Sequence, residues 1–158
     1  MRYIKEATVD ARTRARELTM QALFQLDVQG SGFLILLDDF LVENAPGDFV
    51  LGLARDWTRG TWENLSACDE LIVASVIRWK LSRLSIVDKS ILRLAVYQLR
   101  FCPDIPPKVV INEAIELAKK FGSDKSSAFV NGVIDAVLKS IVLQKTRSRR
   151  QGGGESEG

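Results

Sequence analysis

The pattern of apolar and polar positions is most informative between Leu84 and Phe101, where apolar residues occupy nearly every side of a helical wheel. Such a helix has to be surrounded by other helices, so we expect it to stand at the centre of the fold. Ser85 and Asp88 form a variant of the capping box and predict a helix start near Ser85. The narrow polar wedge of this helix, which we expect to face water, consists of Lys89, Arg93 and Arg100.

Helical spacing of apolar residues predicts six further helices in the rest of the chain. They cover residues 10–29, 33–44, 49–65, 68–81, 108–121 and 126–142. Residues 1–8 are expected to be flexible. The segment 143–158 is basic, then glycine-rich, then acidic, a composition that predicts disorder. The pattern as a whole predicts an all-α protein of about seven helices.

The first predicted helix carries an aromatic residue outside its core stripe. That stripe consists of Ala11, Ala15, Leu18, Ala22 and Leu26. Phe24 falls roughly opposite the stripe beside Met20. Arg12 and Arg16 flank Phe24 on one side, and Arg14 lies on the other. Two interpretations are open: Met20 and Phe24 pack against another helix layer, or the ring of Phe24 stacks on bases beside phosphate-binding guanidiniums, as in single-stranded RNA recognition.

Composition excludes several kinds of chemistry. The 158 residues are 46% hydrophobic and 27% charged, which is ordinary for one compact soluble domain. The longest apolar run, Phe33–Leu37, is far shorter than the roughly 20 residues that cross a bilayer, so we expect a cytoplasmic protein without membrane contact. The chain has no histidine, and Cys68 and Cys102 lack metal-binding spacing, so we expect no metal or cofactor. Glu113 and Glu116 share a helix side with two lysines, which favours solvated pairs over catalytic carboxylates.

Charge is unevenly distributed along the chain, although the net charge is only +2. Residues 27–70 are strongly acidic. The cationic residues concentrate at the two ends, where they comprise Arg2, Lys5, Arg12, Arg14 and Arg16, and then Lys145, Arg147, Arg149 and Arg150. Cationic clusters of this kind suit a polyanionic partner.

Three blocks of sequence, at residues 12–29, 82–99 and 105–138, resemble the NusB family of transcription antitermination factors. The last block, IPPKVVINEAIELAKKFGSDKSSAFVNGVIDAVL, is the most specific. The resemblance implies an all-helical fold of about seven helices in two packed bundles, formed by residues 9–66 and 67–142. It also implies a protein that is not an enzyme. Members of the family bind single-stranded boxA RNA of ribosomal RNA leader transcripts together with the ribosomal protein NusE, and this complex helps RNA polymerase pass terminators.

The resemblance also implies which residues contact RNA. Arg12, Arg14 and Arg16 match the arginine-rich start of the family's first helix, and Phe24 and Phe129 match its stacking aromatics. Weaker candidates for RNA contact are Lys120, Asp124 and Lys125. Asp88 matches an acidic position near the RNA and NusE surface, although its capping role is sufficient to explain it.

Two departures from the family pattern bear on affinity. Thr13 interrupts the arginine run, and Phe24 stands where a tyrosine is common. The basic tail is expected to compensate, so that deletion of residues 144–158 would flatten the salt dependence of RNA binding.

Two alternatives to an RNA-binding factor are considered. One is a protein-interaction scaffold or homodimer that uses the Met20 and Phe24 side as its interface, which would block RNA. The other is the NusB-like domain of ribosomal RNA methyltransferases, and the chain's lack of a glycine-rich strand-to-helix motif disfavours it.

Overall fold

The computed structural model describes residues 2–76 and 80–152, with side chains from residue 11 onward. The described residues form seven α-helices and two short 3₁₀-helices, with no strand among them, which confirms the all-α prediction. The α-helices are α1 (Arg2–Gln29), α2 (Leu34–Asn44), α3 (Asp48–Glu63), α4 (Leu65–Ser75), α5 (Ile86–Phe101), α6 (Pro107–Phe121) and α7 (Ser126–Gly152). The 3₁₀-helices are η1 (Ser31–Phe33) and η2 (Leu81–Arg83).

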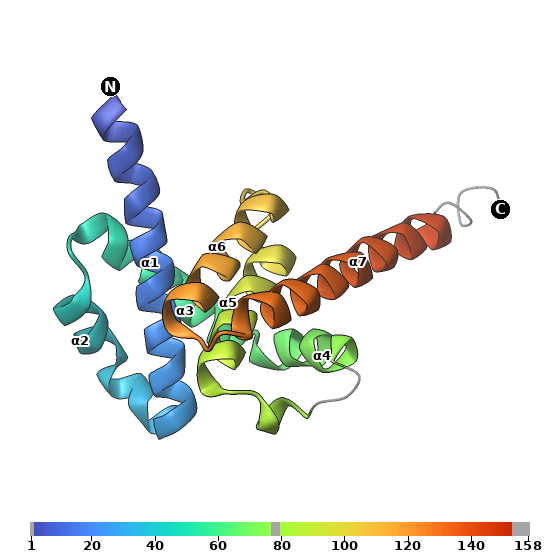
Figure 1. Ribbon diagram of the computed structural model, residues 1–158, viewed down its shortest axis with the longest axis horizontal. Helices are drawn as coiled ribbons and strands as arrows, with labels where there is room; N and C mark the ends of the chain where they lie inside the picture. The colour runs from blue at the N-terminus through green and yellow to red at the C-terminus, as the bar shows by residue number, and fades with distance from the viewer. Residues whose placement is uncertain (1, 77–79, 153–158) are drawn as a thin grey trace.

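Helix α5 is the central element of the fold, as its sequence predicts. Helices α1, α3, α4, α6 and α7 all pack against it (Figure 1). Every residue from Ser90 to Val96 is buried, because neighbouring helices cover all sides of this segment. The hydroxyl oxygen of Ser85 accepts a hydrogen bond from the backbone N–H of Asp88 at 3.1 Å, which confirms Ser85 as the N-cap.

The polar wedge of α5 does not face water as expected, because most of it is buried in ion pairs. Arg93 Nε and Nη2 donate to the two carboxylate oxygens of Asp69 at 2.8 and 2.9 Å. Arg93 Nη1 and Lys89 Nζ reach the carboxylate of Asp27 at 2.9 and 3.1 Å. These contacts join α1, α4 and α5, and only Arg100 of the wedge is exposed. The prediction was wrong for Arg93 because both of its partners are distant in sequence.

Helices α1, α4 and α7 differ most from their predicted ranges. Helix α1 begins at Arg2 instead of Asp10 and projects beyond the body of the protein (Figure 1). Helix α4 ends at Ser75, and the part of the predicted helix at residues 77–79, with Arg78 and Trp79, lies outside the described residues. Helix α7 continues to Gly152, so the segment 143–152 is helical instead of disordered. Residues 153–158 lie outside the described part of the chain.

The core contains the predicted stripe of α1. Ala15, Leu18, Ala22 and Leu26 are buried in α1, and Ala11 packs against them. Met20 is also buried, at 3% exposure. For Met20, this confirms the interpretation that the side chain packs against another helix layer. The buried residues form one continuous cluster from Ala15 to Ile141, so the division into bundles 9–66 and 67–142 stays a prediction.

Helix α7 is long and apolar enough, by length and composition, to cross a membrane. Its most apolar 18-residue window has a mean hydropathy of 1.5, and a third of that window is buried in the fold. The buried apolar residues are Val130, Val133, Ile134, Val137 and Ile141, and α7 packs with them against α4, α5 and α6. A stripe of this kind is typical of a core helix in a globular fold.

Candidate nucleic-acid interface

Two ion pairs connect α1, which carries Arg14 and Phe24, to α6 and to α5. Lys120 Nζ lies 2.8 Å from Glu17 Oε1 and joins the end of α6 to α1. Lys89 joins the start of α5 to Asp27, near the end of α1. At 100° per residue, Glu17, Phe24 and Asp27 lie within about 80° of one another on α1. The side of α1 that carries Phe24 is therefore the side on which α6 ends and α5 begins.

A groove of about 350 Å³ lies where α5 and α7 begin. It is lined by Arg83, Leu84, Ser85, Asp88, Ser123, Lys125, Ser126 and Phe129. Phe129 is half-buried and packs against the core on one side, so its ring is held while part of it stays accessible. We call this hollow the Phe129 groove. It brings together three of the predicted residues, namely Asp88, Lys125 and Phe129.

The polar groups of the Phe129 groove comprise both charges and an acceptor without a partner. Arg83 and Lys125 are exposed cations that line the groove together with the apolar side chains of Leu84 and Phe129. Oδ1 of Asp88 is buried and has no hydrogen-bond partner among the described residues. A partly accessible ring, two cations and a carboxylate are groups that can hold an unpaired nucleotide. The ring stacks on a base, the cations pair with phosphates, and the carboxylate accepts a hydrogen bond from a base amino group.

A second hollow, of about 340 Å³, lies between α1, the end of α2 and the end of α6. Its polar lining consists of Arg14, Glu17, Gln21, Asn44 and Lys120. Arg14 and Lys120 are both exposed, and the structure thus brings these two predicted cations together. Asp124 is exposed in the loop between α6 and α7 and lines neither hollow.

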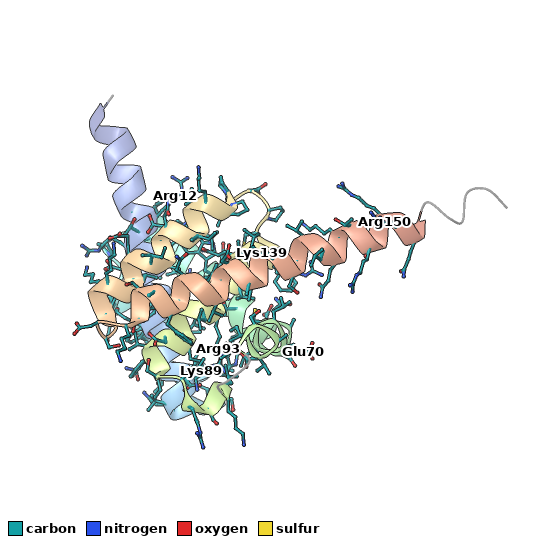
Figure 2. The ribbon with its side chains drawn as sticks, turned by 45° about the vertical axis from the view of Figure 1, so that its right-hand side comes forward. Arg12, Glu70, Lys89, Arg93, Lys139 and Arg150 are labelled. Atoms are coloured by element: carbon teal, nitrogen blue, oxygen red, sulfur yellow. The ribbon has the colours of Figure 1, made fainter. Side chains whose placement is uncertain are left out.

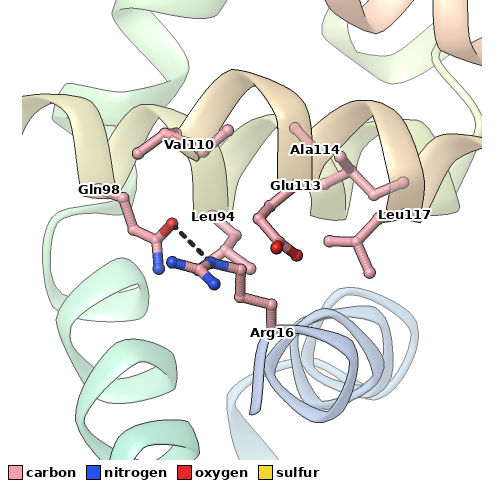
Figure 3. Close-up of a pocket in the computed structure, with 9 residues that line it drawn as sticks. Arg16, Leu94, Gln98, Val110, Glu113, Ala114 and Leu117 are labelled. Carbon is pink, nitrogen blue, oxygen red and sulfur yellow. Dashed lines mark hydrogen bonds between the residues drawn. The ribbon is translucent and has the colours of Figure 1, made fainter. Parts of the chain in front are cut away.

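Arg16 lies in the interior, so it does not belong to the surface predicted for it. The residue is only 3% exposed, and its guanidinium carbon lies 5.0 Å from the ring centroid of Trp57. Figure 3 shows the guanidinium between Gln98 and Glu113, with Nε donating to Oε1 of Gln98 at 3.5 Å. Burial lowers the pKa of Arg16, and the nearby carboxylate of Glu113 opposes this shift. The arginine therefore has a structural role.

A sequence signal for the burial of Arg16 exists in the same helix. Thr19 and Leu23 follow it at helical spacing, and both are buried, so Arg16 continues a second inner stripe. Glu113 was expected to form a solvated pair with a lysine of its own helix, but its carboxylate is partly buried and contacts another helix. Thr13 Oγ1 donates to its carboxylate, 3.2 Å from each oxygen, so the residue that interrupts the arginine run connects α1 to α6.

Arg12 is exposed but points away from Arg14. Its guanidinium carbon lies 5.6 Å from the ring centroid of Phe49 in α3, whereas Arg14 lies beside the end of α6. The structure therefore separates the three arginines into three environments. Phe24 is half-buried, so its ring is neither in the deep core nor fully free. The burial of Met20 removes it from any homodimer interface.

The sequence alone did not identify several lining residues. Arg83, Ser123 and Ser126 line the Phe129 groove, and Gln21 and Asn44 line the second hollow. The sequence held a signal for Arg83, because this residue lies two positions before the predicted N-cap Ser85 and therefore near the start of the central helix.

Comparison with known proteins identifies the family. The NusB family model matches residues 13–139. Transcription antitermination protein NusB of Anaeromyxobacter dehalogenans is 47% identical over 131 residues, covering 82% of this chain and 92% of the relative. The corresponding protein of Pseudothermotoga lettingae is 40% identical over 136 residues, covering 86% and 96% of the two chains.

Solved structures agree with this assignment. NusB of T. maritima has a TM-score of 0.73 at 41% identity and covers 81% of this chain and 90% of its own. NusB in a crystal structure of the antitermination factors NusB and NusE with double-stranded RNA has a TM-score of 0.75 at 26% identity. That likeness covers 83% of this chain and 98% of the other. This chain therefore belongs to the NusB family of transcription antitermination proteins.

Proposed function

We propose that this protein is a transcription antitermination factor that binds single-stranded boxA RNA of ribosomal RNA leader transcripts together with ribosomal protein NusE. The names of the relatives support the antitermination role, and the solved complex of NusB and NusE with double-stranded RNA supports NusE and RNA as classes of partner. The observation that carries the proposal is the Phe129 groove, which is lined by a partly accessible ring, two exposed cations and Asp88.

In this account one base stacks on Phe129 and donates an amino hydrogen to the carboxylate of Asp88, which lines the same groove. Arg83 and Lys125 neutralise the phosphates next to that base, because both are exposed and line the same groove. The RNA continues along α1, where Phe24 offers a second partly accessible ring. Arg14 and Lys120 then neutralise phosphates at the second hollow. Arg16 takes no part because it is buried.

The partner surface for NusE includes Asp88, at the edge of the same groove. A shared edge would let NusE and RNA strengthen each other's binding, since each would order groups that the other contacts. The protein joins the RNA polymerase antitermination complex through these contacts. It acts in the cytoplasm by binding, without catalysing a reaction.

The test compares RNAs and partners with the unaltered protein. We expect boxA RNA to bind more tightly than a scrambled RNA of the same length, and we expect NusE to increase that preference. A scrambled RNA isolates the general electrostatic attraction, because it carries the same number of phosphates. Equal binding of the two RNAs, with and without NusE, would contradict the proposal.

A further inference from the structure

The last turns of α7 form a basic arm that projects from the body of the protein. We define the basic arm as residues 142–151, all of which are exposed, whereas Ile141 before them is buried. Figure 2 shows its side chains, Arg150 among them, spreading from a helix with no other element beside it. The arm lies beyond residues 13–139, which are the part of the chain that matches the family model.

The charge of the arm is of one sign. Between residues 136 and 151 the chain has five cations and no anion. Lys139 Nζ pairs with Asp135 Oδ2 at 3.0 Å. No described residue forms an ion pair with the other four cations, which are Lys145, Arg147, Arg149 and Arg150. Four unpaired cations on about 15 Å of helix make a concentrated positive surface.

The distribution of these cations around the helix shows what kind of partner fits. Gln144, Ser148 and Gln151 continue the side of α7 that is buried upstream, and all three are polar and uncharged. The four cations occupy the remaining about 200° of the circumference. The arm's apolar residues are only Val142 and Leu143, at 54% and 59% exposure. A surface with so little apolar area suits a solvated polyanion better than an apolar partner or a bilayer interior.

The same helix carries a groove residue at its start and the arm at its end. Eighteen residues separate Phe129 from Arg147, which is about 27 Å of helix. At about 3.4 Å per phosphate along one stacked strand, about eight nucleotides cover that distance. RNA that extends beyond the nucleotides held in the Phe129 groove can therefore reach the arm.

We propose that the basic arm is a second phosphate-binding surface, which takes the RNA that flanks the element held at the Phe129 groove. This inference rests on the proposed function, because the groove fixes where the flanking RNA begins. The arm contributes charge and no base recognition. It should therefore raise affinity for long RNA in proportion to the phosphates it neutralises, without changing which element the groove prefers.

The experiment neutralises the arm and measures the salt dependence of binding. One variant of the full chain combines Lys145→Gln, Arg147→Gln, Arg149→Gln and Arg150→Gln. A control variant changes Arg59, Arg100, Lys108 and Lys119 to glutamine, which removes the same charge from exposed positions elsewhere. Each protein is titrated with boxA RNA alone and with boxA RNA extended by about ten nucleotides on either side, a length chosen to exceed the reach of the arm.

With extended RNA, we expect log K to fall less steeply with log salt for the arm variant than for the unaltered protein. The magnitude of the slope should decrease by about 3, which corresponds to four phosphate contacts at about 0.7 each. We expect little change with the short RNA, and little change in the control variant with either RNA. Equal slope changes in the two variants would overturn the inference, because they would reflect net charge alone. A slope that the arm variant leaves unchanged would also overturn it.

A further measurement with lipid vesicles tests whether the partner of the basic arm is RNA or a membrane surface. Vesicles of anionic and neutral phospholipid are sedimented with the unaltered protein and with the arm variant. Sedimentation that requires the arm, together with an unchanged RNA slope, would overturn the inference in favour of a membrane partner. If short boxA RNA binds no better than scrambled RNA, the proposed function fails, and this inference fails with it. If short RNA binds well and the flanks add nothing, only the inference fails.

Discussion

Arg93 of α5 donates a hydrogen bond from Nη1 to Oδ1 of Asp27 in α1 at 2.9 Å. The side chain of Arg93 is only 8% exposed. Lys89 approaches the other oxygen of the same carboxylate. Asp27 therefore neutralises two cations of the central helix. Because these contacts lie beside the segment that carries Phe24, they hold α1 and α5 in the arrangement that the candidate interface needs.

Removing Asp27 should destabilise the protein strongly. In Asp27→Ala, Arg93 keeps Asp69 while Lys89 loses its carboxylate, and the buried positive charge is less well compensated. We expect a loss of about 3 kcal/mol in the free energy of unfolding, measured by urea denaturation. Asp38→Ala is the matched control, since its pair with Arg55 is more exposed and should contribute about 0–1 kcal/mol. Equal losses in the two variants would contradict this account.

The same carboxylate predicts a pH dependence of stability. Burial alone would raise the pKa of Asp27, but hydrogen bonds from Lys89 and Arg93 hold it below its usual value. The stabilisation is therefore complete above the unfolded pKa of about 3.9 and is lost as the pH falls through the lower pKa of the folded state. Unfolding free energies measured below pH 4 should fall more steeply for the unaltered protein than for Asp27→Asn. Parallel curves would show that Asp27 makes no such contribution.

Two glycines of α3 should respond to alanine in opposite ways. A Cβ on Gly60 would overlap the hydroxyl and ring of Tyr97 in α5, whereas one on Gly52 would meet no atom within 4 Å. Gly60→Ala should cost about 1–3 kcal/mol through overpacking. Gly52→Ala should stabilise by up to about 1 kcal/mol through helix propensity. Thermal unfolding of both variants checks the prediction, and a stabilised Gly60→Ala would disprove the close crossing of α3 and α5.

Two arginines that lie two residues apart, on different sides of α1, should separate stability from RNA binding. Arg14 is exposed beside Lys120, so Arg14→Ala should leave stability unchanged within about 0.5 kcal/mol and reduce the salt slope of RNA binding by about 0.7. Arg16 is buried between Gln98 and Glu113, so Arg16→Ala should lower stability by about 2–4 kcal/mol. At temperatures where Arg16→Ala is folded, its salt slope should match that of the unaltered protein. A reversed assignment of the two effects would refute the placement of these side chains.

The sequence was sufficient for features that local patterns determine. The central position of α5 follows from apolar residues on nearly all its sides, and the cap at Ser85 follows from the spacing to Asp88. The core stripe of α1 was also predicted. For the site, Asp88, Lys125 and Phe129 were expected and lie in one groove. That they contact RNA stays a prediction.

Features that depend on contacts between distant residues could not be read in the same way. The burial of Arg93 depends on Asp27 and Asp69, which lie on other helices, and a helical wheel shows neither. Arg16 looked like a surface cation because Gln98 and Trp57 become its neighbours only after folding. The helix through residues 143–152 was missed for a different reason: its low apolar content predicts disorder, although arginine, lysine and glutamine are good helix formers.

The most direct test of the account is the affinity of boxA RNA for Phe129→Ala, with Phe129→Trp and Phe101→Ala as controls. Phe101 is a partly exposed aromatic at the far end of α5, so its loss tests the effect of removing any surface ring. We predict that Phe129→Ala weakens binding by about 5- to 150-fold, the equivalent of about 1–3 kcal/mol for one stacked base. We predict that Phe129→Trp and Phe101→Ala bind nearly as well as the unaltered protein. Unchanged affinity in a folded Phe129→Ala would contradict the central claim that this groove holds an unpaired base.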